Sequence, residues 1–248
     1  MKKDRNIFPD RRRFLLLGGA SVFIYSAIPL VSTFAQSDAS KNVKIGIVGS
    51  GKIGSTIGEL WVKAGHQIML SSRHPEELKS LAEKLGPNAR TGTVEQAIAF
   101  GEVVFLAVPY AAIPQIGRDN AAGLKGKVVL DACNPIASRD GDIVKEANEI
   151  GVGAASAKYL PGTRLVRAFN SFSWLTFAKE SNRAGERIGV PIAGDDAEAL
   201  AIAAKLVRDA GFEPVAVPLA RAKEFAPPGP LFTKALPVSE LKLQLGIK

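Results

Sequence analysis

The sequence predicts an α/β protein built on a doubly wound parallel sheet, with a small C-terminal extension. Two observations carry this prediction. Short apolar runs alternate with helical periodicity from residue 43 to residue 217, and a glycine-rich turn joins the first apolar run to the first helical segment. Strands that are separated by helices typically pair in parallel and take helices on both faces, which is the arrangement of an open α/β sheet.

The length and periodicity of each segment define the individual elements. A helix is expected from residue 53 to about residue 65, a second from Pro75, a third over 94–99 and a fourth over 197–210. The segment 218–248 is rich in proline and is expected to be mostly irregular. The strands are expected at residues 43–48, 67–71, 89–91, 102–107, 127–131, 165–168, 188–193 and 214–217.

The first 35 residues have the pattern of a secretory signal, because a basic segment precedes the uncharged stretch 14–35. The block Arg11-Arg12-Arg13-Phe14-Leu15 resembles the twin-arginine motif, although Leu16 stands where a lysine often follows. We expect export to the periplasm by the twin-arginine translocase, cleavage after Ala35 and a polar linker over 36–42. Without cleavage, the uncharged stretch would anchor the N-terminus in the membrane.

The charge of the chain does not indicate a nucleic-acid partner. The formal net charge is +8, but residues 1–35 hold half of this excess, and the rest shows no basic stripe with interleaved aromatic residues. The sequence has a single cysteine, Cys133, so an intramolecular disulfide is excluded. No spacing of His, Cys, Asp or Glu is typical of a metal site, and none is predicted.

The glycine-rich turn predicts a dinucleotide site, because its Gly-x-Gly-x-x-Gly spacing lies between a strand and a helix. Gly49 permits the tight turn, Gly51 lets the backbone approach a pyrophosphate, and Gly54 lets the helix pack on the strand. Amide groups at the helix start would then face two phosphates. The predicted pyrophosphate-binding residues are Gly49, Ser50, Gly51, Lys52, Ile53 and Gly54.

The end of the second predicted strand favours NADP(H) over NAD(H). An Asp or Glu at this point would bind the ribose 2′-hydroxyl and repel a 2′-phosphate. The chain has Ser71, Ser72 and Arg73 instead, and two hydroxyls with a guanidinium form a suitable cradle for phosphate oxygens. The alternative is that Arg73 is only a solvated charge, and His74 is more simply a bystander than a further donor.

Further short motifs follow the later strands: Ala107-Val108-Pro109, Asn134-Pro135, Arg167-Ala168-Phe169-Asn170 and Ala193-Gly194-Asp195-Asp196. Together with the glycine turn and Ser71-Ser72-Arg73, their order resembles that of the NADPH-dependent deazaflavin (coenzyme F-420) reductases, the 8-hydroxy-5-deazaflavin:NADPH oxidoreductases. The dinucleotide domain of the six-transmembrane metalloreductases is related. The resemblance spans roughly residues 43–222, nearly all of the chain after the predicted signal.

This resemblance implies that the nicotinamide lies near Val108-Pro109 and Asn134-Pro135, with a deazaflavin or flavin ring against it as co-substrate. Hydride transfer between two rings depends on proximity and orientation more than on acid–base chemistry. The sequence shows no nucleophile–base pair, so we assign no catalytic residue. Asn170 either binds the nicotinamide or acceptor, or caps the next helix. Cys133 is expected to be a buried core thiol, and His66 to be structural.

The sequence therefore predicts an NADP-binding Rossmann domain over 43–170 and a smaller C-terminal α/β portion with a proline-rich tail over 171–248. The expected activity is hydride transfer between NADP(H) and a deazaflavin or flavin, a small-molecule redox acceptor. Fold and cofactor do not determine the acceptor, so two alternatives stay open. One is an exported module that binds or senses NADPH without turnover, and the other is an NADPH-dependent reductase of a small carbonyl compound. A homodimer is compatible with the sequence.

Overall fold

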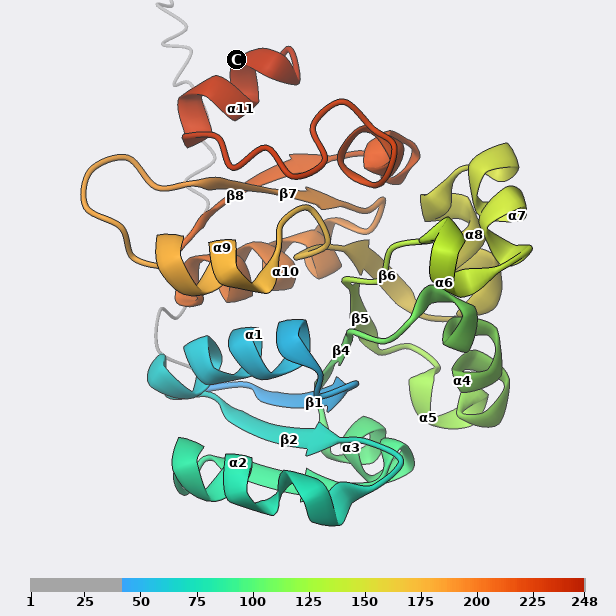
Figure 1. Cartoon of the computed structure of the whole chain (residues 1–248), viewed down its shortest axis with the longest axis vertical. Helices are drawn as coiled ribbons and strands as arrows, with labels where there is room; N and C mark the ends of the chain where they lie inside the picture. Colours follow the sequence, from blue (N-terminus) through green and yellow to red (C-terminus); the bar gives the residue numbers. More distant parts are fainter. Residues whose placement is uncertain (1–41, 248) are drawn as a thin grey trace, which may run out of the picture. The chain divides into compact units, whose positions relative to one another are not determined.

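The structure, a computed structural model, describes residues 42–247 (Figure 1). The predicted signal peptide, 1–35, and the linker up to residue 41 lie outside the described residues. All the described residues belong to one compact unit, so the C-terminal portion after residue 170 continues the same body. In this part of the chain, no helix is both long and apolar enough to cross a membrane.

An eight-stranded sheet runs through the centre of the molecule in the order β3-β2-β1-β4-β5-β6-β7-β8. Each of the eight predicted strands is confirmed, with every boundary within one residue of the expected position. The strands are β1 (Lys44–Val48), β2 (Gln67–Ser71), β3 (Ala89–Gly92), β4 (Val103–Leu106), β5 (Val128–Asp131), β6 (Arg164–Arg167), β7 (Gly189–Ala193) and β8 (Glu213–Val217).

The sheet is a mixed one, which corrects the prediction that all its strands are parallel. β6 and β7 pair in antiparallel fashion at a single position, Arg167 with Ala193, while the other neighbouring strands are parallel. A fully buried strand is apolar along its whole length whether it runs parallel or antiparallel to its neighbour, and therefore its sequence does not show its direction. The predicted Rossmann-type α/β fold is otherwise confirmed.

Helices cover both faces of the sheet, and two apolar clusters fill the space beneath them. One cluster lies under α1 (Lys52–Lys63), α2 (Lys79–Leu85), α9 (Trp174–Glu180) and α10 (Ala197–Asp209). The other lies under α3 (Val94–Phe100), α4 (Ile113–Asp119), α5 (Ala121–Leu124), α7 (Ile143–Ile150), α8 (Val152–Tyr159) and α11 (Val238–Gln244). The remaining helical turns are η1 (Pro75–Leu78), η2 (Tyr110–Ala112), α6 (Ala137–Asp140) and η3 (Leu219–Phe225).

The C-terminal tail is more regular than predicted, because η3 and α11 both lie within it. α11 begins directly after Pro237, and a proline just before the first helical residue costs no intrahelical hydrogen bond. Leu241 of α11 is 2% exposed and packs against the second cluster. The prolines of the tail therefore mark the starts and ends of short elements.

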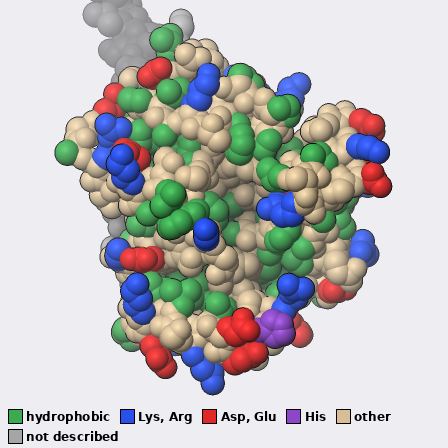
Figure 2. All heavy atoms as spheres, viewed as in Figure 1, with side chains coloured by type: hydrophobic (Ala, Val, Ile, Leu, Met, Phe, Trp, Pro, Cys, Tyr) green, Lys and Arg blue, Asp and Glu red, His purple; other side chains and the backbone are tan. Residues whose placement is uncertain are grey.

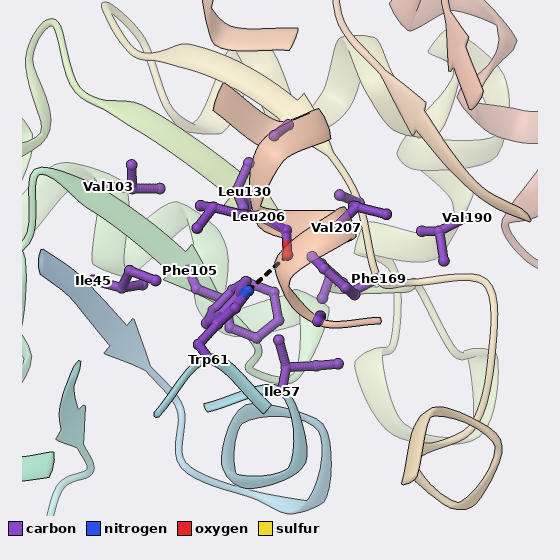
Figure 3. Packing of buried hydrophobic residues seen from close by; sticks show 14 of the residues in the cluster. Ile45, Ile57, Trp61, Val103, Phe105, Leu130, Phe169, Val190, Leu206 and Val207 are labelled. Atoms are coloured by element: carbon purple, nitrogen blue, oxygen red, sulfur yellow. Dashed lines mark hydrogen bonds between the residues drawn. The ribbon is translucent and has the colours of Figure 1, made fainter. Parts of the chain in front are cut away.

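Trp61 of α1 is the centre of the first cluster (Figure 3). Its ring is fully buried and makes edge-to-face contacts with Phe105 at 5.0 Å and Phe169 at 5.5 Å between ring centroids. Its indole Nε1 donates a hydrogen bond of 2.8 Å to the carbonyl oxygen of Leu206 in α10. One side chain thus joins α1, the sheet and α10, while its only polar atom is satisfied.

His66, which precedes β2, is buried and has the predicted structural role. Its Nδ1 accepts a hydrogen bond from the amide of Val43 at 3.0 Å, and its Nε2 lies 2.9 Å from a carboxylate oxygen of Asp209. Lys205 also contacts that oxygen, at 2.6 Å. Burial lowers the pKa of His66 below its ordinary value, although Asp209 acts in the opposite direction.

The lowered pKa predicts that the protein loses stability in mildly acidic solution. Below a pH of about 6.5, the unfolded chain protonates this imidazole, whereas the folded protein does so only at lower pH. The free energy of unfolding should therefore fall as the pH drops from 6.5 towards the lowered pKa. Urea denaturation between about pH 8 and pH 5 would measure this slope.

His66→Asn is the matched variant, because its side-chain oxygen replaces Nδ1 as the acceptor for Val43 but does not titrate. It should lose this part of the pH dependence, whatever its stability at neutral pH. An unchanged slope would show that another group is responsible.

Candidate functional site

A cavity of about 330 Å³ lies beyond the carboxyl ends of β1, β4 and β5. In Figure 1, β1 and β2 point towards the side of the molecule that holds α6, α7 and α8. Ligands of open α/β sheets bind at this edge. The residues that line the cavity are Lys52, Ile53, Ala107, Val108, Pro109, Ala132, Cys133, Asn134, Ile136 and Arg139.

Much of the predicted site converges on this cavity. Lys52 and Ile53 come from the glycine turn, Val108 and Pro109 follow β4, and Asn134 follows β5. The structure therefore brings together three segments that are far apart in the sequence. Pro135 is buried beside the cavity and does not line it.

The glycines of the turn are required for two different reasons. Gly49 has φ of +96°, and a Cβ there would lie 2.4 Å from the carbonyl oxygen of Ala107; a Cβ on Gly54 would lie 2.0 Å from that of Gly49. These two glycines are therefore needed by the fold itself. A Cβ on Gly51 would meet nothing within 4 Å, and its backbone is exposed. The fold leaves open space at Gly51, as a ligand that approaches the backbone requires.

The N-terminus of α1 is suited to an anion. Gly51 is its N-cap residue and supplies no side-chain cap, and the first turn holds no acidic residue. Its amide groups and the positive end of the helix dipole therefore remain available, as in phosphate-binding turns. Ser50 does not contribute its hydroxyl to this set, because both its amide and its Oγ donate to the carbonyl oxygen of Ser71, at 3.2 and 3.1 Å.

The three residues that were predicted to bind the 2′-phosphate differ in their exposure: Ser71 is buried, Ser72 is half-buried and Arg73 is exposed. Ser71 is fully buried, and its hydroxyl donates to the carbonyl oxygen of Ile47 at 2.8 Å, so it holds β2 to β1 and does not reach a ligand at the surface. Ser72 is half-buried, and its Oγ accepts a hydrogen bond from the amide of His74 at 2.9 Å. Arg73 is exposed at the surface, beside this turn.

A buried ion pair lies directly beneath the cavity. Arg167 at the end of β6 donates to Asp131 at the end of β5 at 2.5 Å, and both side chains are fully buried. The same guanidinium donates to the Ser156 hydroxyl at 3.1 Å and to the Cys133 carbonyl at 2.7 Å. It also reaches the Asn134 side-chain oxygen at 3.2 Å. Arg167 thereby positions the loop that carries Cys133 and Asn134 into the cavity wall.

Asn170 completes this network. Its side-chain nitrogen donates to the Asn134 side-chain oxygen and to the Phe225 carbonyl, both at 3.1 Å, and its carbonyl accepts from the Asn134 side chain at 2.6 Å. It does not cap α9, because Ser173 is the N-cap and accepts from the amide of Thr176. The capping alternative is therefore wrong. The Asn170 side-chain oxygen is buried and has no hydrogen-bond partner among residues 42–247.

The residue before Asn170 is conformationally strained. Phe169 is fully buried and has φ of +61°, in the left-handed region that bulky side chains rarely adopt. Its ring contacts those of Trp61, Phe105 and Phe177, and this packing compensates for the backbone strain. The strain fixes the direction in which the chain leaves β6 and hence the position of Asn170.

Cys133 is a buried core thiol, as predicted, although it touches the cavity. It is 2% exposed, its Sγ donates to the carbonyl oxygen of Leu106, and it accepts from the amide of Val108, each at 3.4 Å. Burial and the neighbouring Asp131 raise the pKa of this thiol well above its ordinary value. The thiol therefore stays protonated and has little nucleophilic character.

Sequence reasoning missed the roles of Asp131, Ser156 and Arg167. A signal was present, because a carboxylate ends the apolar strand β5 and a guanidinium ends the neighbouring strand β6. Buried charges are rare unless they are paired, so this coincidence could have predicted the pair. Among the residues that the structure describes, no group of three or more His, Cys, Asp or Glu could hold a metal ion.

The network predicts that Arg167→Met is strongly destabilising. The substitution leaves Asp131 buried without its partner, which costs about 3–5 kcal/mol in comparable pairs. The double variant Asp131→Asn with Arg167→Met removes the uncompensated charge and should recover part of this loss. The free energy of unfolding in urea would be compared for the three proteins. If Arg167→Met were as stable as the wild type, the buried ion pair of Asp131 and Arg167 would not contribute to stability as expected.

The fold and this edge site define a Rossmann-type dinucleotide-binding protein, and sequence comparison narrows the class. Residues 44–135 match the family model described as NADP oxidoreductase, coenzyme F420-dependent. The matched region contains the whole glycine turn, Ser71 to Arg73, and the segments after β4 and β5 that line the cavity. Residues 44–135 are thus similar to the NADP-dependent oxidoreductases of that family.

A curated relative agrees with this class. The chain is 30% identical over 183 residues to the metalloreductase STEAP3 of Rattus norvegicus, an alignment that covers 69% of the chain. The chain spans about a third of that relative, since 33% of its length is covered.

Two solved structures share the fold. A hypothetical protein from Sinorhizobium meliloti superposes with a TM-score of 0.69 at 26% identity, over 79% of this chain and 96% of that one. A protein from Arthrobacter sp. FB24, provisionally described as an F420-dependent NADP-reductase, has a TM-score of 0.64 at 22% identity. That likeness covers 73% of this chain and 87% of the other, and at this identity it supports the fold alone.

Proposed function

We propose that the protein is an NADPH-dependent oxidoreductase whose hydride acceptor is a flavin or a deazaflavin. One observation carries the proposal: the cavity at the ends of β1, β4 and β5 is built by the same residues, 44–135, that match the NADP-oxidoreductase family model, apart from Ile136 and Arg139. When bound, NADPH would supply a hydride to the acceptor. The protein's task is to bind and orient the two molecules.

The residues present fit this dinucleotide. The open space at Gly51 and the uncapped start of α1 suit a pyrophosphate, and Lys52 adds a positive charge at the same point. Ser72 and Arg73 lie where β2 ends, at the position that selects the ribose substituent. Ser71 supports them through its bond to Ile47 and is not itself a phosphate ligand.

The lining of the cavity favours a ring acceptor over a small carbonyl compound. Reduction of a carbonyl leaves an alkoxide that an acidic group must protonate, and tyrosine, histidine or a carboxylic acid commonly does so. None of these three residue types lines the cavity within residues 42–247; of the other proton donors that enzymes use, Lys52 lies at the expected pyrophosphate and the Cys133 thiol is buried. Tyr110 lies nearby, but its hydroxyl bonds to Ser156 and Val152, and burial raises its pKa to about 12. Val108, Pro109 and Ile136 instead offer apolar surface to a flat ring.

Export remains a separate proposal that rests on residues 1–35 alone. The relevant test is the N-terminal sequence of protein recovered from the periplasm, which should begin at Gln36. Precursor that is found only in the cytoplasm would contradict export without affecting the enzymatic proposal.

Arg73→Ala tests the choice of cofactor. The substitution removes the guanidinium that meets the 2′-phosphate, and a charged hydrogen bond of this kind is worth about 1.5–3 kcal/mol. NADPH affinity should therefore fall roughly ten- to a hundredfold. NADH affinity should change little, because NADH lacks this phosphate. Titration of both nucleotides gives the result, with Arg118→Ala on α4 as an exposed control that should change neither. Equal losses for NADPH and NADH would mean that Arg73 supports structure only.

Gly51→Val tests whether binding leads to turnover. The wild type should oxidise NADPH when a deazaflavin or a flavin is added, which is followed by loss of absorbance of the reduced nicotinamide. The valine occupies the space that the pyrophosphate needs, so the variant should neither bind nor oxidise NADPH. Since a Cβ at this position would meet no protein atom within 4 Å, the variant should unfold at nearly the wild-type temperature.

Gly54→Val is the contrasting variant, because its Cβ would collide with the Gly49 carbonyl and should lower the unfolding temperature. A wild type that binds NADPH tightly and transfers hydride to no acceptor would refute the enzyme and favour a binding or sensing module.

A further inference from the structure

The cavity has a charge pattern that the binding of NADP(H) does not explain. Its lining contains two cationic side chains, Lys52 and Arg139, and no carboxylate. Figure 2 shows a hollow on this face between the surface over α1 and α9 and the surface over α6 to α8. Lys and Arg side chains flank it on both sides, whereas the acidic side chains in this view gather away from it.

The two cations come from opposite sides of the cavity. Lys52 is the first residue of α1, directly after the glycine turn, and its Nζ lies 5.1 Å from the centre of the Trp174 ring. Arg139 belongs to α6, after β5, and β4 lies between β1 and β5 in the sheet. The pyrophosphate expected at the glycine turn would be served by Lys52. Arg139 is then a second positive charge, on the side of the cavity away from that turn.

Arg139 is held rigidly. Its Nε and one terminal nitrogen donate to the two carboxylate oxygens of Asp140 at 3.0 and 2.8 Å, and the same terminal nitrogen donates to the Asn134 carbonyl at 2.9 Å. Asp140 is itself fixed by the amides of Ile136 and Ala111, at 2.8 and 3.3 Å. The Arg139 side chain is 46% exposed, while that of Asp140 is fully buried.

This arrangement keeps Asp140 ionised as the anchor of a fixed guanidinium. Burial alone would raise the pKa of Asp140, but hydrogen bonds from Arg139 and from the two amides leave it below its ordinary value. A guanidinium that is already oriented loses little conformational entropy when it binds an anion, and its planar donors match phosphate or carboxylate oxygens.

From these observations, and resting on the function proposed above, we infer that Arg139 selects acceptors whose ring carries an anionic side chain, a phosphate or carboxylate, and that Asp140 is its positioning residue. The acceptor ring lies against the nicotinamide, Ile136 offers it apolar surface beside Arg139, and Arg139 holds the anionic group. An otherwise identical acceptor without that group binds more weakly.

Riboflavin and FMN provide the test, because they share one ring and differ by a phosphate. Their dissociation constants would be measured with protein saturated with NADP⁺, by the quenching of flavin fluorescence. The wild type should bind FMN about tenfold more tightly than riboflavin, the factor expected of one partly exposed charged hydrogen bond. In Arg139→Met the two constants should become equal within about twofold, through weaker binding of FMN alone, with NADP⁺ affinity unchanged.

Two further variants keep the test decisive if Arg139→Met folds poorly. Arg139→Lys retains the charge without the two-point contact to Asp140, and should lower the preference for FMN to an intermediate value. Asp140→Asn leaves the arginine in place but loosens it, and should lower the preference severalfold without a change in riboflavin affinity. Arg118→Met on α4 is the matched control and should keep the wild-type preference.

The possible failures are distinguishable. Equal affinity of the wild type for FMN and riboflavin, or a preference that survives Arg139→Met, would overturn this inference and leave the proposed function intact. A parallel loss of NADP⁺ and FMN affinity in Arg139→Met would also overturn it, because Arg139 would then hold the dinucleotide. Binding of NADP⁺ without binding of either flavin would overturn the proposed function, and this inference with it.

Discussion

A single buried guanidinium, that of Arg167, determines the shape of the site. Removing a charge from water is costly, so this group needs partners within the protein. Its terminal nitrogens donate to Asp131, Cys133 and Asn134, at the end of β5 and in the loop after it, and to Ser156 in α8, whereas its Nε has no hydrogen-bond partner among residues 42–247. The contacts with Cys133 and Asn134 fix the loop that follows β5. The position of the cavity wall after β5 therefore depends on the charge beneath it.

Steric constraints complete what the charge network begins. Gly49 and Gly54 allow β1, β4 and α1 to approach to distances at which any side chain would collide, while Gly51 leaves open space on the outer side of the same turn. Phe169 is held in a left-handed conformation by Trp61, Phe105 and Phe177. The aromatic core under the sheet therefore sets the direction of the chain at the site above it. Stability and ligand binding use the same contacts here, as is common where strained residues border a site.

The electrostatics of the site follow from a division of roles among its charges. The deepest pair, Asp131 with Arg167, is neutral as a whole and has a structural role. The second pair, Asp140 with Arg139, is buried at its acidic end and open at its basic end, so it presents a positive charge to the cavity. With Lys52 on the opposite side, the cavity lining holds two cationic side chains and no carboxylate, which suits a site for anionic molecules. A protein that only retained NADPH would need the first cation and not the second.

The sequence by itself determined the eight strands, the Rossmann-type fold and the dinucleotide turn, because apolar runs and glycine spacing are local signals of burial and backbone conformation. Tertiary structure decided what depends on orientation. The side chain of Ser71 faces Ile47 because of its register with β1, and the direction of β7 follows from its one pairing with β6. The ion pair of Asp131 and Arg167 joins residues that are 36 positions apart in the sequence. Arg139 and Asp140 are adjacent in the sequence, but only the tertiary structure places Arg139 of α6 in the lining of the cavity. Charges pair according to their distance in space, and the sequence pattern does not give the distance between strands that are far apart along the chain.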